Sequence, residues 1–108
     1  MIDVSHIGAA PIVDVREAVD MLSAPNLQNA LRTAETSSRG PIVLMLSDCP
    51  FCDSACIGLV LRSAHLIGNR FRVVVPDGTV PHRLFAIMGL ADQPFVFESL
   101  DDALALES

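Results

Sequence analysis

The sequence has no lysine and few basic residues of any kind. Its 108 residues include seven basic side chains, all of them arginine, against 13 acidic ones, so the formal net charge at pH 7 is -6. Nucleic-acid binding depends largely on basic side chains that displace counterions from the phosphate backbone. This charge balance therefore predicts that the protein does not bind nucleic acid directly.

Long apolar segments are also missing. No run reaches the roughly 18 apolar residues that would suggest a membrane-spanning helix. The first ten residues, MIDVSHIGAA, have neither a basic start nor an apolar stretch of signal-peptide length. We therefore expect a cytoplasmic protein without a membrane span. Because 51% of the residues are hydrophobic, the chain is long enough to bury one core, and we expect a single domain over residues 1–108.

Apolar runs and helical patterns alternate along the chain without an internal repeat, which favours a sheet that carries helices. Two segments rich in β-branched residues flank Gly8 and predict an N-terminal hairpin. The segment 42–46 is apolar throughout, as expected of a central strand that is covered on both faces. Strands are predicted at 2–5, 11–16, 42–46, 71–75 and 94–97.

Helical patterns lie between and after the last four of these strands. Ser23 is a plausible N-cap of the first helix, Pro81 is tolerated in the first turn of the third, and Ser99 can cap the last. Helices are predicted at 23–38, 54–67, 81–88 and 100–106. The predicted fold class is α/β, with a mixed sheet of four to five strands, an N-terminal hairpin, otherwise mainly parallel strands and about four helices.

All three cysteines lie in one stretch, SDCPFCDSAC, between the predicted central strand and the helix that follows it. Cys49 and Cys52 have the spacing of a dithiol active site, and together with the Thr-Val-Pro of residues 79–81 they resemble the glutaredoxins. That resemblance covers two short motifs only. The connection between the motifs is too short for a thioredoxin-like fold, which needs a further helix and strand there.

Other roles for the cysteines require no special chemistry. Cys49 and Cys52 fit a partly buried loop as small apolar side chains, and Cys56 fits the core of a helix. An odd number of cysteines in a reducing compartment argues against a structural disulfide framework. A closed zinc site needs a fourth ligand. The sequence has three histidines, His6, His65 and His82. None of them has the spacing from the cysteines that a zinc site requires. We expect neither a metal nor a cofactor.

Asp53 and Ser54 allow a third interpretation of the same stretch. Ser54 stands where a loop enters a helix, so its hydroxyl can cap that helix. A phosphate on the same oxygen would add roughly 1.5 to 2 negative charges beside the N–H groups at the helix end, which accept an anion without a change in the backbone. The fold would persist while the charge of the surface changed.

The whole pattern resembles the STAS domains, specifically the bacterial anti-sigma factor antagonists. The resemblance runs in the same order over nearly the whole chain. It rests on three segments: VDMLSAPNLQNAL, FCDSACIGLVLRSA and LFAIMGLADQPFVFESLDDALAL. The second segment is similar to the Asp-Ser motif of the family. The third is similar to its C-terminal signature, in which a Gly-Leu turn precedes a short strand and an acidic last helix.

This resemblance implies a regulatory protein, not an enzyme. Members of the family bind a kinase-type anti-sigma factor and so release a sigma factor, and the kinase can phosphorylate the serine after the aspartate. Carried over, Ser54 is the phospho-acceptor, Asp53 its neighbour at the docking site, and Asp20 the acidic residue at the partner-facing end of the second strand. Ala55 and Cys56 complete the implied partner-binding set.

Two alternatives stay open. One is a STAS subunit of another regulatory complex or of an ABC lipid-transport complex. The other is a glutaredoxin-like thiol oxidoreductase that uses Cys49 and Cys52.

Three residues depart from the family pattern. Cys56 stands where the motif normally has glycine, Glu17 replaces a turn glycine before Asp20, and Met45 occupies a strand position that is often Asp or Asn. Glycine is used where backbones meet closely, so a side chain at Cys56 is expected to crowd the approach of a kinase.

Overall fold

The structure is a computed structural model and describes residues 2–105. Its elements, in chain order, are β1 (Ile2–Ile7), β2 (Ala10–Val15), α1 (Ala24–Ser37), β3 (Ile42–Met45), α2 (Ser54–Ile67), the short 3₁₀ helix η1 (Gly68–Arg70), β4 (Phe71–Val74), α3 (Val80–Ile87), β5 (Val96–Phe97) and α4 (Leu100–Ala105). This order confirms the prediction from the sequence. The expected end of the last helix, Leu106, lies outside the described residues.

The strands of residues 2–105 form one sheet in the order β1-β2-β3-β4-β5. β1 pairs with β2 in antiparallel register, with Ile7 opposite Ala10, and every later pair is parallel. The hairpin turn is shorter than expected and consists of Gly8 and Ala9, with Gly8 at a φ of 60° that favours glycine. The predicted fold class, a mixed sheet with an N-terminal hairpin, is confirmed.

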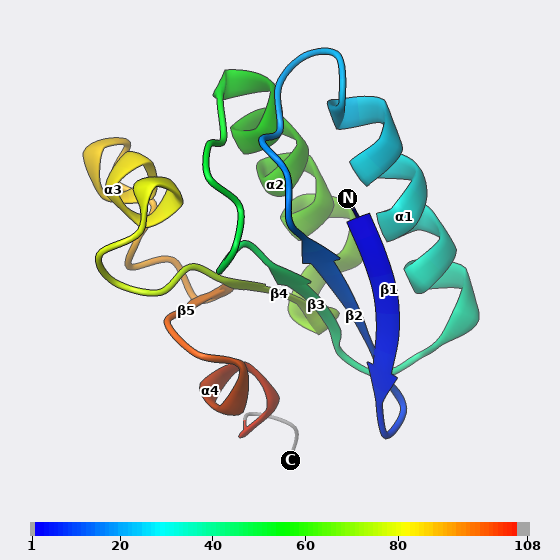
Figure 1. Cartoon of the computed structure of the whole chain (residues 1–108). Helices are drawn as coiled ribbons and strands as arrows, with labels where there is room; N and C mark the ends of the chain where they lie inside the picture. The colour runs from blue at the N-terminus through cyan, green and yellow to red at the C-terminus, as the bar shows by residue number, and fades with distance from the viewer. Residues whose placement is uncertain (1, 106–108) are drawn as a thin grey trace.

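The sheet lies between two layers, with α1 and α2 on one face and α4 on the other (Figure 1). On one face, Leu44 of β3 and its neighbours pack against α1 and α2, and Phe85 of α3 joins the same core. On the other face, Val43 of β3 packs with Ala103 of α4. Because the side chains of β3 point alternately to both layers, β3 is apolar throughout, as the sequence predicts.

Helix α1 buries Leu27, Leu31 and Ala34, which share one face at helical spacing. The expected N-cap of this helix is wrong in one respect. Ser23 holds the N-cap position, but its side chain does not cap the helix. Its hydroxyl oxygen lies instead 3.2 Å from both the carbonyl oxygen of Ala18 and Oδ1 of Asp20, and its single proton can be donated to either of them.

The caps of the two later helices are side-chain hydroxyls. Thr79 caps α3 by accepting a hydrogen bond from the N–H of His82 at 3.3 Å, so this helix begins one residue earlier than expected. Ser99 accepts from the N–H of Asp102 at 3.1 Å, as predicted for α4. Within residues 2–105, no helix is both long enough and apolar enough to cross a membrane.

Parallel strands end at the same edge of a sheet, and this places the loops of interest together. In Figure 1 the chain leaves β2 and β3 in the same direction, and each loop then enters a helix, α1 or α2, at that end of the molecule. The stretch from Ser47 to Cys56 therefore lies next to the segment that leads into α1.

The burial of β3 gives a stability prediction. Leu44 is 0% exposed, whereas Leu66 on α2 is 70% exposed. Leu44→Ala is expected to lower the free energy of unfolding by about 2–5 kcal/mol, because it removes buried methyl groups and leaves a cavity. The matched control Leu66→Ala should change it by less than about 0.5 kcal/mol. Urea denaturation measures both, and equal losses would contradict this core.

Candidate functional site

The loops after β2 and β3 are joined by a short parallel bridge between Val19 and Cys52. The N–H of Val19 donates to the carbonyl oxygen of Phe51 at 2.9 Å, and the N–H of Asp53 donates to the carbonyl oxygen of Val19 at 3.2 Å. The residue after Val19 is Asp20. The bridge thus holds the segment of Asp20 beside the start of α2, and the structure brings these two parts of the sequence-predicted site together.

Asp53 is the N-cap of α2. One of its carboxylate oxygens accepts hydrogen bonds from the N–H groups of Ala55 at 2.9 Å and Cys56 at 3.2 Å. The expectation that Ser54 caps this helix is therefore wrong. Ser54 is the first helical residue, and its side chain is exposed to solvent. A carboxylate at this position also interacts favourably with the positive end of the helix dipole.

Asp20 is exposed and organises the turn that leads into α1. Its Oδ1 accepts hydrogen bonds from the N–H groups of Ser23 at 3.0 Å and Leu22 at 2.9 Å, and from the Ser23 hydroxyl at 3.2 Å. These bonds, that from the Ser23 N–H first, lower the pKa of Asp20 because they favour the charged form.

The expected position of Asp20 needs correction. β2 ends at Val15, so Asp20 lies five residues beyond the strand, in a turn and not at the strand end. The bridge at Val19 resumes the strand direction just before it, which is why Asp20 still lies at the same edge of the molecule as the start of α2.

The cysteines form a different arrangement from the one expected. Cys52 and Cys56 are joined by a disulfide, with their Cα atoms 5.5 Å apart, whereas the sequence argued against a disulfide. The glutaredoxin-like pair, Cys49 with Cys52, is not formed, because Cys49 is free. Its Sγ donates to the carbonyl oxygen of Phe51 at 3.1 Å, and burial raises the pKa of this thiol. No group of three or more metal-ligating side chains occurs in the described part of the chain.

Two departures from the family pattern now have a physical account. Cys56 is 0% exposed and its side chain points inward to Cys52, so it does not crowd the surface and cannot contact a partner in this conformation. The expected crowding by this side chain is therefore wrong, whereas the expected place of Cys56 in the core of a helix is confirmed. Met45 packs in the core beneath α4, away from Ser54, so a polar side chain is not needed there. Ala55 is half-exposed and remains available at the surface.

Three large apolar side chains next to the site were not predicted from the sequence. Met21 and Leu22 are 76% and 87% exposed in the turn formed by Asp20, and Phe51 is 49% exposed in the loop before α2. Exposed apolar side chains that gather in one place mark interaction surfaces. Their position in the sequence, close to Asp20 and Asp53, was the available signal. We call Asp20, Met21, Leu22, Phe51 and Ser54 the docking surface.

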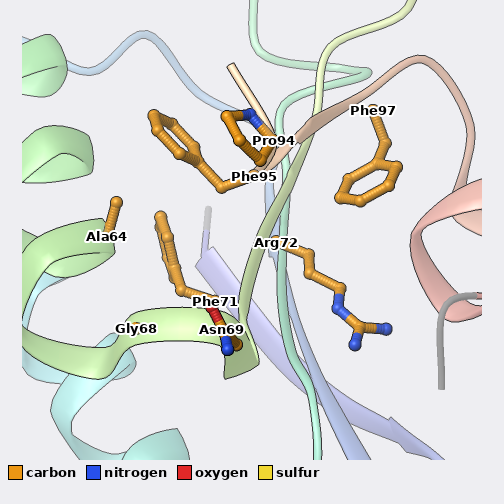
Figure 2. Close-up of a pocket in the computed structure, with 8 residues that line it drawn as sticks. All are labelled: Ala64, Gly68, Asn69, Phe71, Arg72, Pro94, Phe95 and Phe97. Atoms are coloured by element: carbon orange, nitrogen blue, oxygen red, sulfur yellow. The ribbon is translucent and has the colours of Figure 1, made fainter. Parts of the chain in front are cut away.

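A pocket of about 390 Å³ lies elsewhere, at the other end of α2. In Figure 2, Phe71 and Phe95 lie on one side of β4, and Arg72 and Phe97 lie on the other. The rings of Phe71 and Phe95 have centroids 6.4 Å apart. Because α2 has 14 residues and is about 21 Å long, this pocket is remote from Ser54.

Comparison with known proteins gives a clear family match. Residues 2–100 match the family model described as "Mlab, STAS domain". No curated protein matches the sequence significantly.

Solved structures give the same fold. An anti-sigma factor antagonist from Mycobacterium paratuberculosis is 26% identical, with a TM-score of 0.88, over 99% of this chain and 92% of that one. The unphosphorylated form of the anti-sigma factor antagonist SpoIIAA is 20% identical, with a TM-score of 0.71, over 98% of this chain and 95% of that one. The phosphorylated form of SpoIIAA from Bacillus is 18% identical, with a TM-score of 0.65, over 98% of both chains.

The cap of α2 yields a second prediction. Asp53→Ala is expected to lower the free energy of unfolding by about 0.5–2 kcal/mol, because the N–H groups of Ala55 and Cys56 lose their acceptor. Asp53→Asn should keep most of that stability, since asparagine caps about as well. Ser54→Ala is the second control and should change it by less than about 0.5 kcal/mol. A larger loss for Ser54→Ala than for Asp53→Ala in thermal or urea denaturation would contradict this assignment.

The hydrogen bonds of Asp20 predict a pH dependence. Since its pKa is lowered in the folded chain, the turn keeps these bonds at and above the ordinary aspartate value of 3.8 and loses them as the pH falls through the lowered pKa. In an NMR titration, the amide protons of Leu22 and Ser23 should shift with a midpoint below 3.8. Asp20→Asn should abolish this transition, and a midpoint above 3.8 would refute the assignment.

Proposed function

The chain belongs to the STAS domain family, and on that premise we propose that it is an anti-sigma factor antagonist switched by phosphorylation of Ser54. The observation that carries the proposal is the position of Ser54. It is the exposed first residue of α2, directly after the capping Asp53 and beside the bridge that holds Asp20. The structural likeness to an anti-sigma factor antagonist at 26% identity supports it.

The proposed partner is an anti-sigma factor of the serine-kinase type, and the proposed activity is binding, not catalysis. Met21, Leu22 and Phe51 supply apolar contact area on the docking surface. Apolar side chains at the centre of such a surface supply much of the binding energy, while charged side chains at its edge set orientation and specificity. The bound anti-sigma factor would then release its sigma factor in the cytoplasm.

Phosphorylation would act on this surface by charge. The N–H groups of Ala55 and Cys56 already donate to Asp53, so they are not available to a phosphate on Ser54. The added charge of roughly -1.5 to -2 would therefore stay at the surface, close to the carboxylate of Asp53. A partner that covers Ser54 would have to desolvate this charge next to a carboxylate, which costs several kcal/mol.

A second candidate function is a STAS subunit of another complex, such as the ABC lipid-transport complex considered from the sequence. The description of the matching family favours it, because that description names Mlab and not an anti-sigma factor antagonist. In this case the docking surface would bind a different protein, and Ser54 would not have to be a kinase substrate.

The test is to identify the protein that co-purifies with the tagged chain by mass spectrometry, and then to measure binding to the purified partner by calorimetry. A serine-kinase anti-sigma factor is expected. Ser54→Asp should weaken its binding on the order of a hundredfold, because like charges face each other. Ser54→Ala is the matched control and should bind within about threefold of the wild-type chain, which is under 1 kcal/mol.

Phosphorylation is tested with the same partner. Incubation with ATP and magnesium should add one phosphate to the wild-type chain and none to Ser54→Ala, as measured by intact mass. An ABC transporter subunit as the only partner would favour the second candidate. Tight binding by Ser54→Asp would sink the phosphorylation switch.

A further inference from the structure

We propose that Cys52 and Cys56 form a reversible oxidative modification site that locks the docking surface, and that reduction of the pair weakens partner binding. The inference rests on the proposed function for its consequence, although the lock itself is a property of the chain alone. No other covalent link occurs between side chains of residues 2–105. The disulfide encloses the N-cap Asp53 and the first two residues of α2, Ser54 and Ala55.

The disulfide ties the bridge with Val19 to the first turn of α2. Cys52 belongs to the bridge with Val19, which is followed directly by Asp20. Cys56 belongs to the first turn of α2, which begins with Ser54. A bond between the two sulfur atoms therefore holds the turn of Asp20 and the first turn of α2 in one fixed relation.

Reduction must change this geometry, because the site has no spare room. Cys52 is 1% exposed and Cys56 is 0% exposed, and both belong to the close-packed main core. Two thiols need more room than one disulfide, since non-bonded atoms of this size stay roughly 3.5–4 Å apart. On this proposal, the separation of the two sulfur atoms in the packed core displaces the bridge or the first turn of α2.

Asp53 transmits such a movement to Ser54. Its N–H donates to Val19 on the bridge, and its carboxylate accepts from Ala55 and Cys56 on the helix. A shift at either sulfur atom therefore alters the hydrogen bonds on both sides of Asp53. The cap weakens, and the exposed Ser54 loses its fixed orientation. A binding surface that is fixed in advance loses less entropy on association than one that must first be ordered.

The chemistry balances with simple reagents. A peroxide oxidises the pair: one thiolate attacks the peroxide oxygen to give a sulfenic acid, and the second thiol then displaces water from that sulfur to form the disulfide. The two sulfur atoms together lose two electrons, which the peroxide gains. A dithiol reverses the step in two exchanges. Its first thiol attacks one sulfur, which breaks the disulfide, releases the other cysteine and leaves a mixed disulfide; its second thiol then closes the reagent into a disulfide and releases the remaining cysteine.

Cys49 provides a matched control. It is also buried, at 3% exposure, yet it is outside the disulfide. Its Sγ donates to the carbonyl oxygen of Phe51 at 3.1 Å and has no sulfur partner. Disulfides in a reducing compartment are usually transient and redox-sensing, which is the behaviour proposed for Cys52 and Cys56.

The first part of the test counts thiols in the purified full-length chain after treatment with hydrogen peroxide or with dithiothreitol. Alkylation under denaturing conditions and peptide mass mapping should find Cys49 alone modified in the oxidised chain and all three cysteines modified in the reduced chain. Cys49→Ala should keep the disulfide. Three free thiols after peroxide treatment, or a disulfide that involves Cys49, would overturn the proposal.

The second part measures the lock without a partner, by amide hydrogen exchange of the peptides that cover residues 16–24 and 50–58. Both should exchange at least about tenfold faster in the reduced chain, which corresponds to about 1.4 kcal/mol of local stability. Cys52→Ala and Cys56→Ala should match the reduced chain under either treatment. Cys49→Ser, which keeps a donor for the carbonyl oxygen of Phe51, should behave like the wild type. Equal exchange in both redox states would refute the lock.

The third part measures binding of the purified anti-sigma factor to both redox forms. Binding about tenfold weaker in the reduced form supports the regulation, and the difference should vanish in Cys52→Ala. Equal affinity in both forms would refute redox control even where hydrogen exchange shows the lock. If no anti-sigma factor binds either form, the proposed function and the binding half of this proposal fail together, whereas thiol mapping and exchange still decide the lock itself.

Discussion

The burial of β3 on both faces is the constraint on which the rest of the structure depends. Leu44 faces α1 and α2, and Val43 faces α4, so the strand can lie only in the middle of the sheet. β2 and β4 flank it in parallel, which requires helical crossovers and brings the loops after β2 and β3 to one edge. The docking surface is a consequence of this arrangement, because its residues come from those two loops.

Charge at the start of α2 shows how structure and function share one group. Asp53 satisfies backbone N–H groups that the first turn of any helix leaves without a partner. The same carboxylate occupies the position at which a helix end would otherwise accept an anion. The N-terminus of α2 is already neutralised by Asp53, so it cannot also neutralise a phosphate on the neighbouring Ser54. The charge of such a phosphate would remain exposed to a binding partner. The stability of the cap, and the sensitivity to phosphorylation that we propose, would thus follow from one side chain.

Most of the fold could be predicted from the sequence, and the reason is local. The 3.6-residue pattern of α2 and the glycine that follows it gave the bounds of that helix, and the apolar run of β3 gave the centre of the sheet. The predictions that were wrong are of two kinds. Some depend on contacts between residues that are distant in the sequence, and others depend on a choice between two residues that suit the position equally well. Asp53 and Ser54 are both good caps, and only the three-dimensional path of the loop decides between them. The partner of Cys52 is likewise set only in the folded chain, because Cys49 and Cys56 both lie close to it in the sequence and spacing alone does not choose between them.

The inward position of Cys56 explains how a family motif can change without loss of the surface it supports. Where the motif has glycine, a side chain that pointed outward would obstruct a partner, but this one lies in the core and is bonded to Cys52. The departure therefore removes nothing from the exposed face of Ser54 and adds a covalent restraint beneath it. Phosphorylation would change the charge above the first turn of α2, and oxidation would change the restraint below it. Phosphorylation and oxidation could therefore act independently on the docking surface. Phosphorylation would change the charge that a partner contacts, and oxidation would change the rigidity of the first turn of α2.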